Sequence, residues 1–166
     1  MAADDFDDFY RAHYGNIVAM AYALTGDLTE AQDLAQEGFC RAWQRWGRIA
    51  GYDDPLAWVR RVVANLASSR WRRLAVVRRH LRREPGPAMV PALGPDHVAL
   101  VAALRTLPEP QRRAVVLHHL VDLPVAAVAR ELGVADGTVK SWLHRGRATL
   151  AARLADPTTA EVIGRD

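Results

Sequence analysis

Apolar side chains recur at helical spacing, three or four residues apart, through most of the N-terminal half of the chain. The pattern predicts helices over about 4–24, 28–46 and 54–74. The breaks between them hold turn and capping residues. Asp27 and Thr29 can each cap the second helix, a loop is expected at about 47–53, and Pro55 suits a first helical turn.

The C-terminal half has the same period. It predicts helices over about 97–106, capped by Asp96, and over 109–121, followed by a helix-turn-helix with a last helix at 136–154. Between the halves, residues 84–95 contain six Pro or Gly in twelve, which no helix tolerates. No strand alternation appears, so the expected fold class is all-α: two small helical domains joined by a Pro/Gly-rich linker. The expected domains are 1–83 and 96–156, with a tail at 157–166.

The helix-turn-helix prediction rests on VAAVARELGVADGTVKSWLH at 125–144. Small Ala129 stands where two helices must cross closely, Gly133 where the first must stop, and Asp136 where it can cap the second. The positions expected to face inward are Val128, Leu132, Val134, Val139 and Trp142. The second helix of this motif presents its N-terminal half to the DNA major groove. An ordinary pair of packed helices that happens to contain a glycine is the alternative.

Composition narrows the class of protein. The single Cys, Cys40, excludes an internal disulfide and a Cys-pair zinc site and fits a reducing compartment. It lies in the apolar run GFCRAW, where a buried side chain is expected. The acidic N-terminus does not match a signal peptide, and no apolar run approaches the roughly 18–20 residues that span a bilayer. We therefore expect a cytoplasmic protein without membrane insertion.

Charge is distributed very unevenly along the chain. Residues 1–55 contain 4 Arg against 10 Asp or Glu, whereas residues 56–83 contain 9 Arg and no acidic residue. Residues 84–166 balance at 9 against 9. Arg accounts for 21 of the 22 basic residues. A GC-rich genome explains most of that excess, but Arg also provides the planar fork that binds phosphate or a guanine edge.

The predicted 54–74 helix has two distinct faces. At about 100° per residue, one narrow stripe contains Arg61, Asn65, Ser68 and Arg72, with Trp58 and Ser69 at its border. The opposite, apolar face contains Val59, Val63, Leu66 and Leu74. A solvated surface helix is the plain interpretation, but such a face usually mixes charges of both signs. Arg interleaved with Trp and small polar side chains instead suits a nucleic-acid strand.

Three stretches in this order resemble the extracytoplasmic-function (ECF) group of bacterial RNA polymerase sigma factors. AQDLAQEGFCRAW at 31–43 is similar to the family's polymerase-binding helix, and AWVRRVVANLASSRWRR at 57–73 to its −10 promoter helix. The stretch 107–150 is similar to the domain that reads the −35 element. The resemblance implies core RNA polymerase and promoter DNA as partners, an anti-sigma factor as a possible further one, and no small-molecule substrate.

The resemblance also implies roles for individual residues. The residues implied in polymerase binding are Asp33, Gln36, Glu37, Phe39, Arg41 and Trp43. Of these, Phe39 and Trp43 are better explained as core residues. Capture of the opened −10 strand falls to Trp58, Arg61, Asn65, Ser68, Ser69, Arg72 and Arg73, with the loop at about 46–54 helping to hold a flipped base. Contacts with −35 DNA fall to Thr138, Lys140, Ser141, His144, Arg145 and Arg147.

The sequence departs from the family pattern in the second half. Trp142 occupies a position where Arg is common, and Gly146 one where Ala is common. A Gly within a helix costs about 1 kcal/mol, so a bend is expected there. The stretch 127–130 also lacks the family's acidic pair. These departures bear on which −35 sequence is read.

Two other classes of protein compete with this interpretation. A stand-alone dimeric regulator that binds a palindromic operator would explain the helix-turn-helix but not the acidic helix or the basic stripe. An enzyme is disfavoured, because no phosphate-binding Gly loop, metal-ligand spacing or nucleophile–base pair appears, and no cofactor, metal or catalytic residue is implied. The adjacent His118 and His119 lie on a mainly apolar helix, one expected at the surface and one partly buried.

Overall fold

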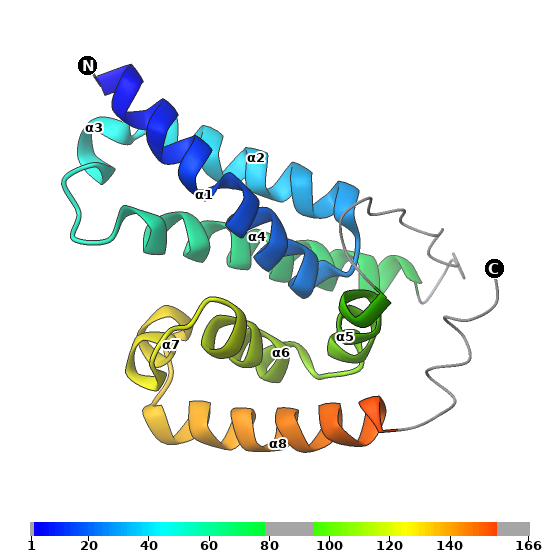
Figure 1. Ribbon diagram of the computed structural model, residues 1–166. Helices are drawn as coiled ribbons and strands as arrows, with labels where there is room; N and C mark the ends of the chain where they lie inside the picture. Colours follow the sequence, from blue (N-terminus) through cyan, green and yellow to red (C-terminus); the bar gives the residue numbers. More distant parts are fainter. Residues whose placement is uncertain (1, 79–94, 156–166) are drawn as a thin grey trace. The chain divides into compact units, whose positions relative to one another are not determined.

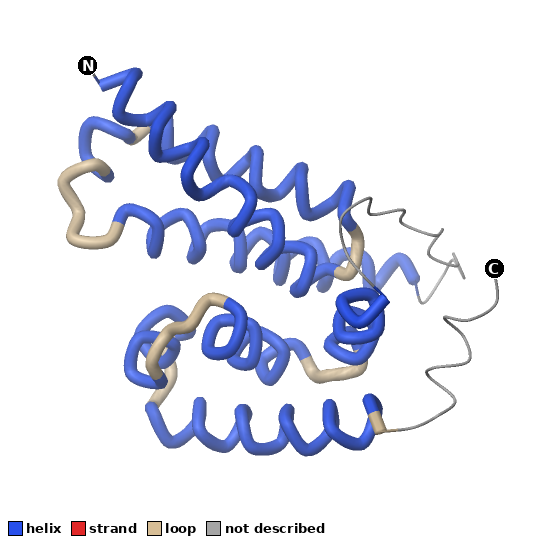
Figure 2. The backbone as a smooth tube through the Cα atoms, in the orientation of Figure 1, coloured by secondary structure: helices blue, strands red, loops and turns tan. Residues whose placement is uncertain are grey.

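The structure, a computed structural model, describes residues 2–78 and 95–155, with the backbone alone described for 2, 70–78 and 95–97. Every regular element in these ranges is helical (Figure 2), which confirms the all-α fold class. The chain divides into two compact units, Met1–Ala88 and Met89–Asp166. Their boundary falls within the expected linker, of which residues 84–94 lie outside the described ranges. The predicted tail at 157–166 lies outside them too.

In its described residues, 2–78, the first unit contains three long helices and one short one: α1 (Ala2–Thr25), α2 (Leu28–Gln44), α3 (Trp46–Ile49) and α4 (Pro55–Arg78). The three long helices pack against one another in pairs (Figure 1). Their buried side chains follow the predicted apolar period and include Ile17, Met20, Ala21, Leu34, Ala35, Val59 and Val63. The hydrophobic pattern therefore places all three helices correctly, because each buries one continuous stripe.

The turns between these helices agree with the sequence in one place and differ in another. Asp27 is the N-cap of α2, since its Oδ1 accepts the Glu30 backbone N–H at 2.9 Å. The expected loop at 47–53 is in part the helix α3. Arg45 lies between α2 and α3 and caps both, so α2 ends at Gln44 rather than at residue 46. A single residue with φ −120° and ψ 14° is enough to change the helix direction.

An aromatic cluster fills the end of the first unit where α1, α2 and α3 meet. Its rings belong to Phe6, Phe9, Tyr10, Tyr14, Phe39, Trp43 and Trp46. The Phe6 ring lies 5.0 Å from Trp43 and 5.2 Å from Trp46, centroid to centroid. Such tilted and edge-on aromatic pairs stabilise a core beyond the area they bury. This cluster fixes the C-terminal end of α2 against the start of α1.

Two sequence-based expectations about α2 are wrong. Cys40 is exposed, not buried, because the buried face of this helix contains Gly38, Phe39 and Ala42. The side chain of Trp43 is 49% exposed, although one side of its ring packs on the aromatic cluster. Both errors come from counting a run of apolar residues as core, whereas the helical period directs residues 40 and 43 away from the buried stripe.

The described part of the second unit, residues 95–155, contains α5 (Pro95–Arg105), α6 (Glu109–Val115), a π-helical turn η1 (Val116–Leu120), α7 (Val125–Leu132) and α8 (Asp136–Leu154). Helix α8 packs against α5, α6 and α7. The single helix predicted over 109–121 is therefore α-helical only to Val115. Helix α5 begins at Pro95, so Asp96 lies inside the first turn and is not the cap.

Gly146 is explained by close packing. A Cβ at this position would lie 2.8 Å from Cγ2 of Val115 and 3.7 Å from Cδ1 of Leu107. Helix α8 is continuous from Asp136 to Leu154, so the glycine does not end the regular helix. The missing side chain lets α6 and α8 approach each other, which offsets the intrinsic cost of Gly in a helix.

Candidate nucleic-acid and partner interfaces

The turn of the helix-turn-helix has the geometry that the sequence predicts. Gly133 ends α7 in the left-handed conformation, with φ 69°, and its backbone N–H donates to the Ala129 carbonyl. The Val134 N–H donates to the same oxygen at 3.0 Å. Only glycine adopts this conformation without a steric penalty, so Gly133 determines the angle at which α8 leaves the turn.

The core of the motif differs from the prediction at several positions. Val128 and Val139 are buried as expected, but Leu132, Val134 and Trp142 are only half-buried. Leu143 is buried in place of Trp142, because it follows Val139 by four residues and continues the same stripe. The N-cap of α8 is Ala135, so Asp136 begins the helix without capping it. Its carboxylate still lies in the first turn, where the helix dipole favours negative charge.

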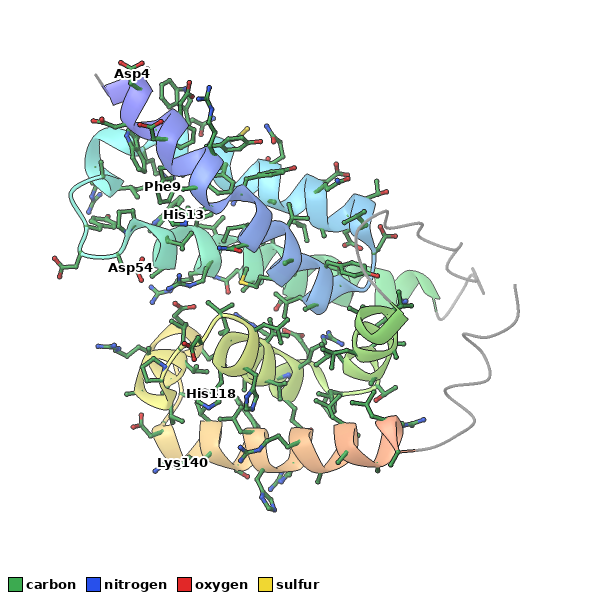
Figure 3. The ribbon with its side chains drawn as sticks, in the orientation of Figure 1. Asp4, Phe9, His13, Asp54, His118 and Lys140 are labelled. Atoms are coloured by element: carbon green, nitrogen blue, oxygen red, sulfur yellow. The ribbon has the colours of Figure 1, made fainter. Side chains whose placement is uncertain are left out.

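The outward face of α8 is cationic. Lys140 (Figure 3), His144, Arg145 and Arg147 are exposed, whereas Thr138 and Ser141 are half-buried. After Asp136 the helix contains no carboxylate. Exposed basic residues on the second helix of this motif can bind DNA phosphates and guanine edges.

The turn before α7 is held by a histidine. Nδ1 of His118, which lies on η1 (Figure 3), is 2.7 Å from the Leu123 carbonyl oxygen and donates its proton to it. Asp122 between them has φ 60°, a conformation that few residues other than Gly adopt. His119 is exposed, and its pKa is lowered, chiefly by partial burial and then by His118 and Arg147. The pair is therefore one partly buried and one surface histidine, as predicted.

The polar strip of α4 is narrower than the sequence predicts. Arg61, Asn65 and Ser69 are exposed and Trp58 is half-buried, but Ser68 is buried. Helix α4 packs against both α1 and α2, so its buried arc is wider than one neighbour would produce and includes Ser68. For the two remaining candidates, Arg72 and Arg73, the structure describes the backbone alone.

A residue pair that the sequence did not reveal fixes the beginning of α4. Oδ1 of Asp54 (Figure 3) accepts the Ala57 backbone N–H at 2.9 Å, and its Oδ2 accepts from Nη2 of Arg60 at 3.0 Å. Arg60 is only 6% exposed, so this charged pair is largely shielded from water on one side. Asp54 thereby joins the loop at 50–54 to the first two turns of α4. The signal in the sequence that could have revealed this cap is an Asp three residues before a backbone N–H in the first turn of a helix.

A second unpredicted contact lies beside this pair. Cζ of Arg45, the residue between α2 and α3, is 5.9 Å from the ring centroid of Trp58, within cation–π range. Tyr52, in the loop that follows α3, is 40% exposed. The start of α4 thus presents aromatic and cationic groups together.

The outer face of α2 presents charged and polar groups. Asp33, Gln36 and Arg41 are exposed, and Nε of Arg41 donates to Oε1 of Glu37 at 2.7 Å. The hydroxyl of Tyr10, on α1, donates to Oε1 of Gln36 at 3.3 Å. Phe39, a candidate for partner binding, is 1% exposed and belongs to the core, where its ring meets the aromatic cluster.

The described residues contain no group of three or more His, Cys, Asp or Glu that could hold a metal ion. Among the same residues, no helix combines the length and apolar character needed to cross a membrane.

An exposed polar strip with Arg61 on one helical unit, followed in the same chain by a helix-turn-helix unit, is typical of a class of two-module DNA-binding proteins. The Sigma-70 region 2 profile matches residues 9–83, and the Sigma-70, region 4 profile matches residues 97–150. Together with ECF sigma factors that match 93% and 96% of the chain at 33% identity, these profiles show that the chain belongs to the ECF group of RNA polymerase sigma factors and acts in promoter-specific initiation of transcription. A stand-alone regulator is accordingly not favoured.

Similar proteins support the assignment to the sigma factor family over nearly the whole chain. The sequence is 32% identical over 152 residues to the RNA polymerase sigma-E factor of Streptomyces coelicolor, covering 90% of this chain and 86% of that protein. It is 33% identical over 162 residues to the ECF RNA polymerase sigma factor SigM of Mycobacterium tuberculosis, covering 96% and 82%. The fold is similar to that of the sigma factor RpoE of Bartonella quintana, solved with the anti-sigma factor NepR, at a TM-score of 0.77 and 23% identity over 90% of this chain and 96% of that one.

Proposed function

We propose that the two units divide promoter recognition between them. In this proposal the module at 1–83 binds core polymerase through α2 and captures the opened −10 strand on α4. The module at 96–156 reads −35 DNA with α8. The observation that supports this division most strongly is the presence, in one chain, of the exposed Arg61 strip on α4 and of a helix-turn-helix with a cationic outer face.

The α4 strip suits single-stranded DNA better than a duplex. Arg61 and Asn65 are exposed on consecutive turns, and Trp58 leaves part of its ring accessible. Arg side chains bind phosphates, while an indole stacks on an unpaired base whatever its identity. Opening a duplex costs base-pair stacking, so binding the single strand more tightly than the duplex favours the open state.

The outer face of α2 suits a basic protein surface. Asp33 and Glu37 lie on this face, Gln36 lies between them, and Trp43 provides a large exposed ring at its end. Aromatic residues within a charged rim are typical of the residues that dominate binding energy. The carboxylates would accelerate and orient the encounter with a basic partner.

The remaining assignments follow from the family. We propose that the chain acts in the cytoplasm, contributes no catalytic residue and leaves RNA synthesis to the polymerase. An anti-sigma factor is a further proposed partner, supported by the complex that the Bartonella quintana relative forms with NepR.

Substitution of Arg61 by Ala tests the role of α4. Holoenzyme assembled from core polymerase and the variant should bind promoter duplex normally but open it poorly, seen as weaker permanganate reactivity of unpaired thymines. The promoter would be one recovered by run-off transcription with the unaltered chain. Arg11→Ala is the matched control, because it removes an exposed Arg from α1. Normal opening by Arg61→Ala would refute the assignment of the strand to this strip.

A further inference from the structure

Arg45 occupies a fixed position at the corner between α2 and α3. Its backbone N–H donates to the Ala42 carbonyl at 3.1 Å, and its carbonyl accepts from the N–H groups of Arg48 and Ile49 at 2.9 and 3.0 Å. Hydrogen bonds on both sides therefore hold its backbone, while the side chain is exposed. An Arg on such a corner loses less backbone freedom on binding a ligand than one on a loop.

The side chain of Arg45 extends toward α4. Its guanidinium carbon is 5.9 Å from the centroid of the Trp58 ring, across 13 residues of sequence and the whole of α3. Trp58 is itself held in place, because Asp54 caps the first turn of α4 and pairs with Arg60. Both partners of the cation–π contact are thus attached to rigid helix ends.

The charges around this contact favour an anionic ligand. Asp54 already accepts from Arg60 and from the Ala57 N–H, so much of its negative charge is compensated. Among the described residues, Arg45 forms no ion pair with a carboxylate. A guanidinium over an indole retains N–H donors at its edge, and the half-buried ring retains accessible surface. Phosphate and base are the two groups that such a pair can bind together.

We propose that Arg45 is a further DNA-binding residue of this sigma factor, which positions Trp58 and binds a backbone phosphate of the nucleotide whose base contacts that ring. The proposal rests on the proposed function, since it assumes that α4 meets the opened −10 strand. It extends the strand-binding surface beyond α4 to the corner between α2 and α3. It also assigns Trp58 a preset orientation before DNA arrives.

The test uses holoenzyme and two fluorescent probes derived from a promoter recovered by run-off transcription. One is a fork junction with a single-stranded non-template −10 segment, and the other is a duplex that ends upstream of that segment. Binding constants are measured over a series of NaCl concentrations for the unaltered chain, Arg45→Ala, Arg45→Lys, Trp58→Ala and the double variant. Arg11→Ala again serves as the control for loss of one exposed charge.

Arg45→Ala should weaken binding to the fork about three- to tenfold and lower the salt slope by about 0.7, the value for one phosphate contact with a single strand. Binding to the duplex probe should not change. Arg45→Lys keeps the charge, so the slope should persist while affinity falls about two- to threefold. The double variant should bind little worse than Trp58→Ala, because the two residues act as a unit.

Two results would overturn the proposal while leaving the proposed function intact. One is a fork affinity and salt slope for Arg45→Ala equal to those of Arg11→Ala, with Trp58→Ala still impaired. The other is an equal loss on both probes, which would mean that Arg45 only stabilises the fold. Failure of the unaltered holoenzyme to prefer the fork over the duplex would instead refute the proposed function of α4, and the proposal with it.

Discussion

Substitution of Gly38 by Ala should destabilise the first unit, although Ala is the better helix former. A Cβ at position 38 would lie 2.5 Å from Cγ2 of Val63, which is fully buried on α4. Comfortable contacts between carbon atoms are about 3.5–4.0 Å, so α2 and α4 would have to separate by about 1 Å. Overpacking of this kind costs about 1–3 kcal/mol, and a gap this short places Gly38→Ala at the upper end of that range.

Ala has a higher helix propensity than Gly by about 1 kcal/mol, which offsets part of this cost. The free energy of unfolding should therefore fall by about 1–2 kcal/mol in Gly38→Ala. Gly15→Ala is the matched control, because α1 offers open space there and nothing lies within 4 Å of the added Cβ. That variant should gain up to about 1 kcal/mol. The difference between the two variants isolates the cost of the close contact, about 2–3 kcal/mol.

Urea unfolding followed by tryptophan fluorescence measures this difference, because four of the five Trp residues precede position 72 and belong to the first unit. Val63→Ala should lose about 2 kcal/mol alone through its deleted methyl groups. Combined with Gly38→Ala it should lose no more than that, since the new methyl group fills the vacated space. Equal stability of Gly38→Ala and Gly15→Ala, or the absence of rescue by Val63→Ala, would refute the reasoning.

Three further predictions concern charged groups. Asp54→Asn keeps a good N-cap but removes the charge that pairs with buried Arg60, so the urea midpoint should fall by the equivalent of about 1–2 kcal/mol; an unchanged midpoint would count against the pair. The pKa of His119 is lowered in the folded chain, so unfolded chains bind more protons, and stability should decline as the pH falls below about 6.5, the ordinary histidine value. An NMR titration should place the His119 midpoint below that of unfolded chain, and His119→Asn should remove this part of the pH dependence. Glu37→Lys reverses a charge on the proposed polymerase surface and should weaken core binding in a fluorescence titration, whereas unchanged affinity would exclude that surface.

The buried face of a helix could be predicted from the sequence wherever a single periodic apolar stripe determines it. Each long helix of the first unit buries residues at the expected spacing, and Gly133 ends α7 because only that position combines a stop signal with a tolerated left-handed conformation. Errors arose where a second neighbour enlarges the buried arc, as at Ser68, or where a run of apolar letters hides the helical period, as at Cys40. A single sequence contains no information on how many helices cover one face.

The contacts that organise the start of α4 were the least predictable part of the candidate site. Arg60 belongs to the acid-free stretch 56–83, but its pairing with Asp54 depends on how the preceding loop folds back. The Arg45–Trp58 contact depends on a change of direction at Arg45, between α2 and α3, in a stretch expected to be continuous helix to residue 46. From the sequence, Gly146 is only an unfavourable residue within a helix. The position of Val115 shows that close packing requires a glycine there.

Run-off transcription from a pool of genomic promoter fragments, with purified core polymerase and the full chain, tests the central claim most directly. The account predicts transcripts that require both components and that start downstream of two sequence elements at a fixed separation, one read by each unit. Transcripts identical to those of core polymerase alone would contradict it.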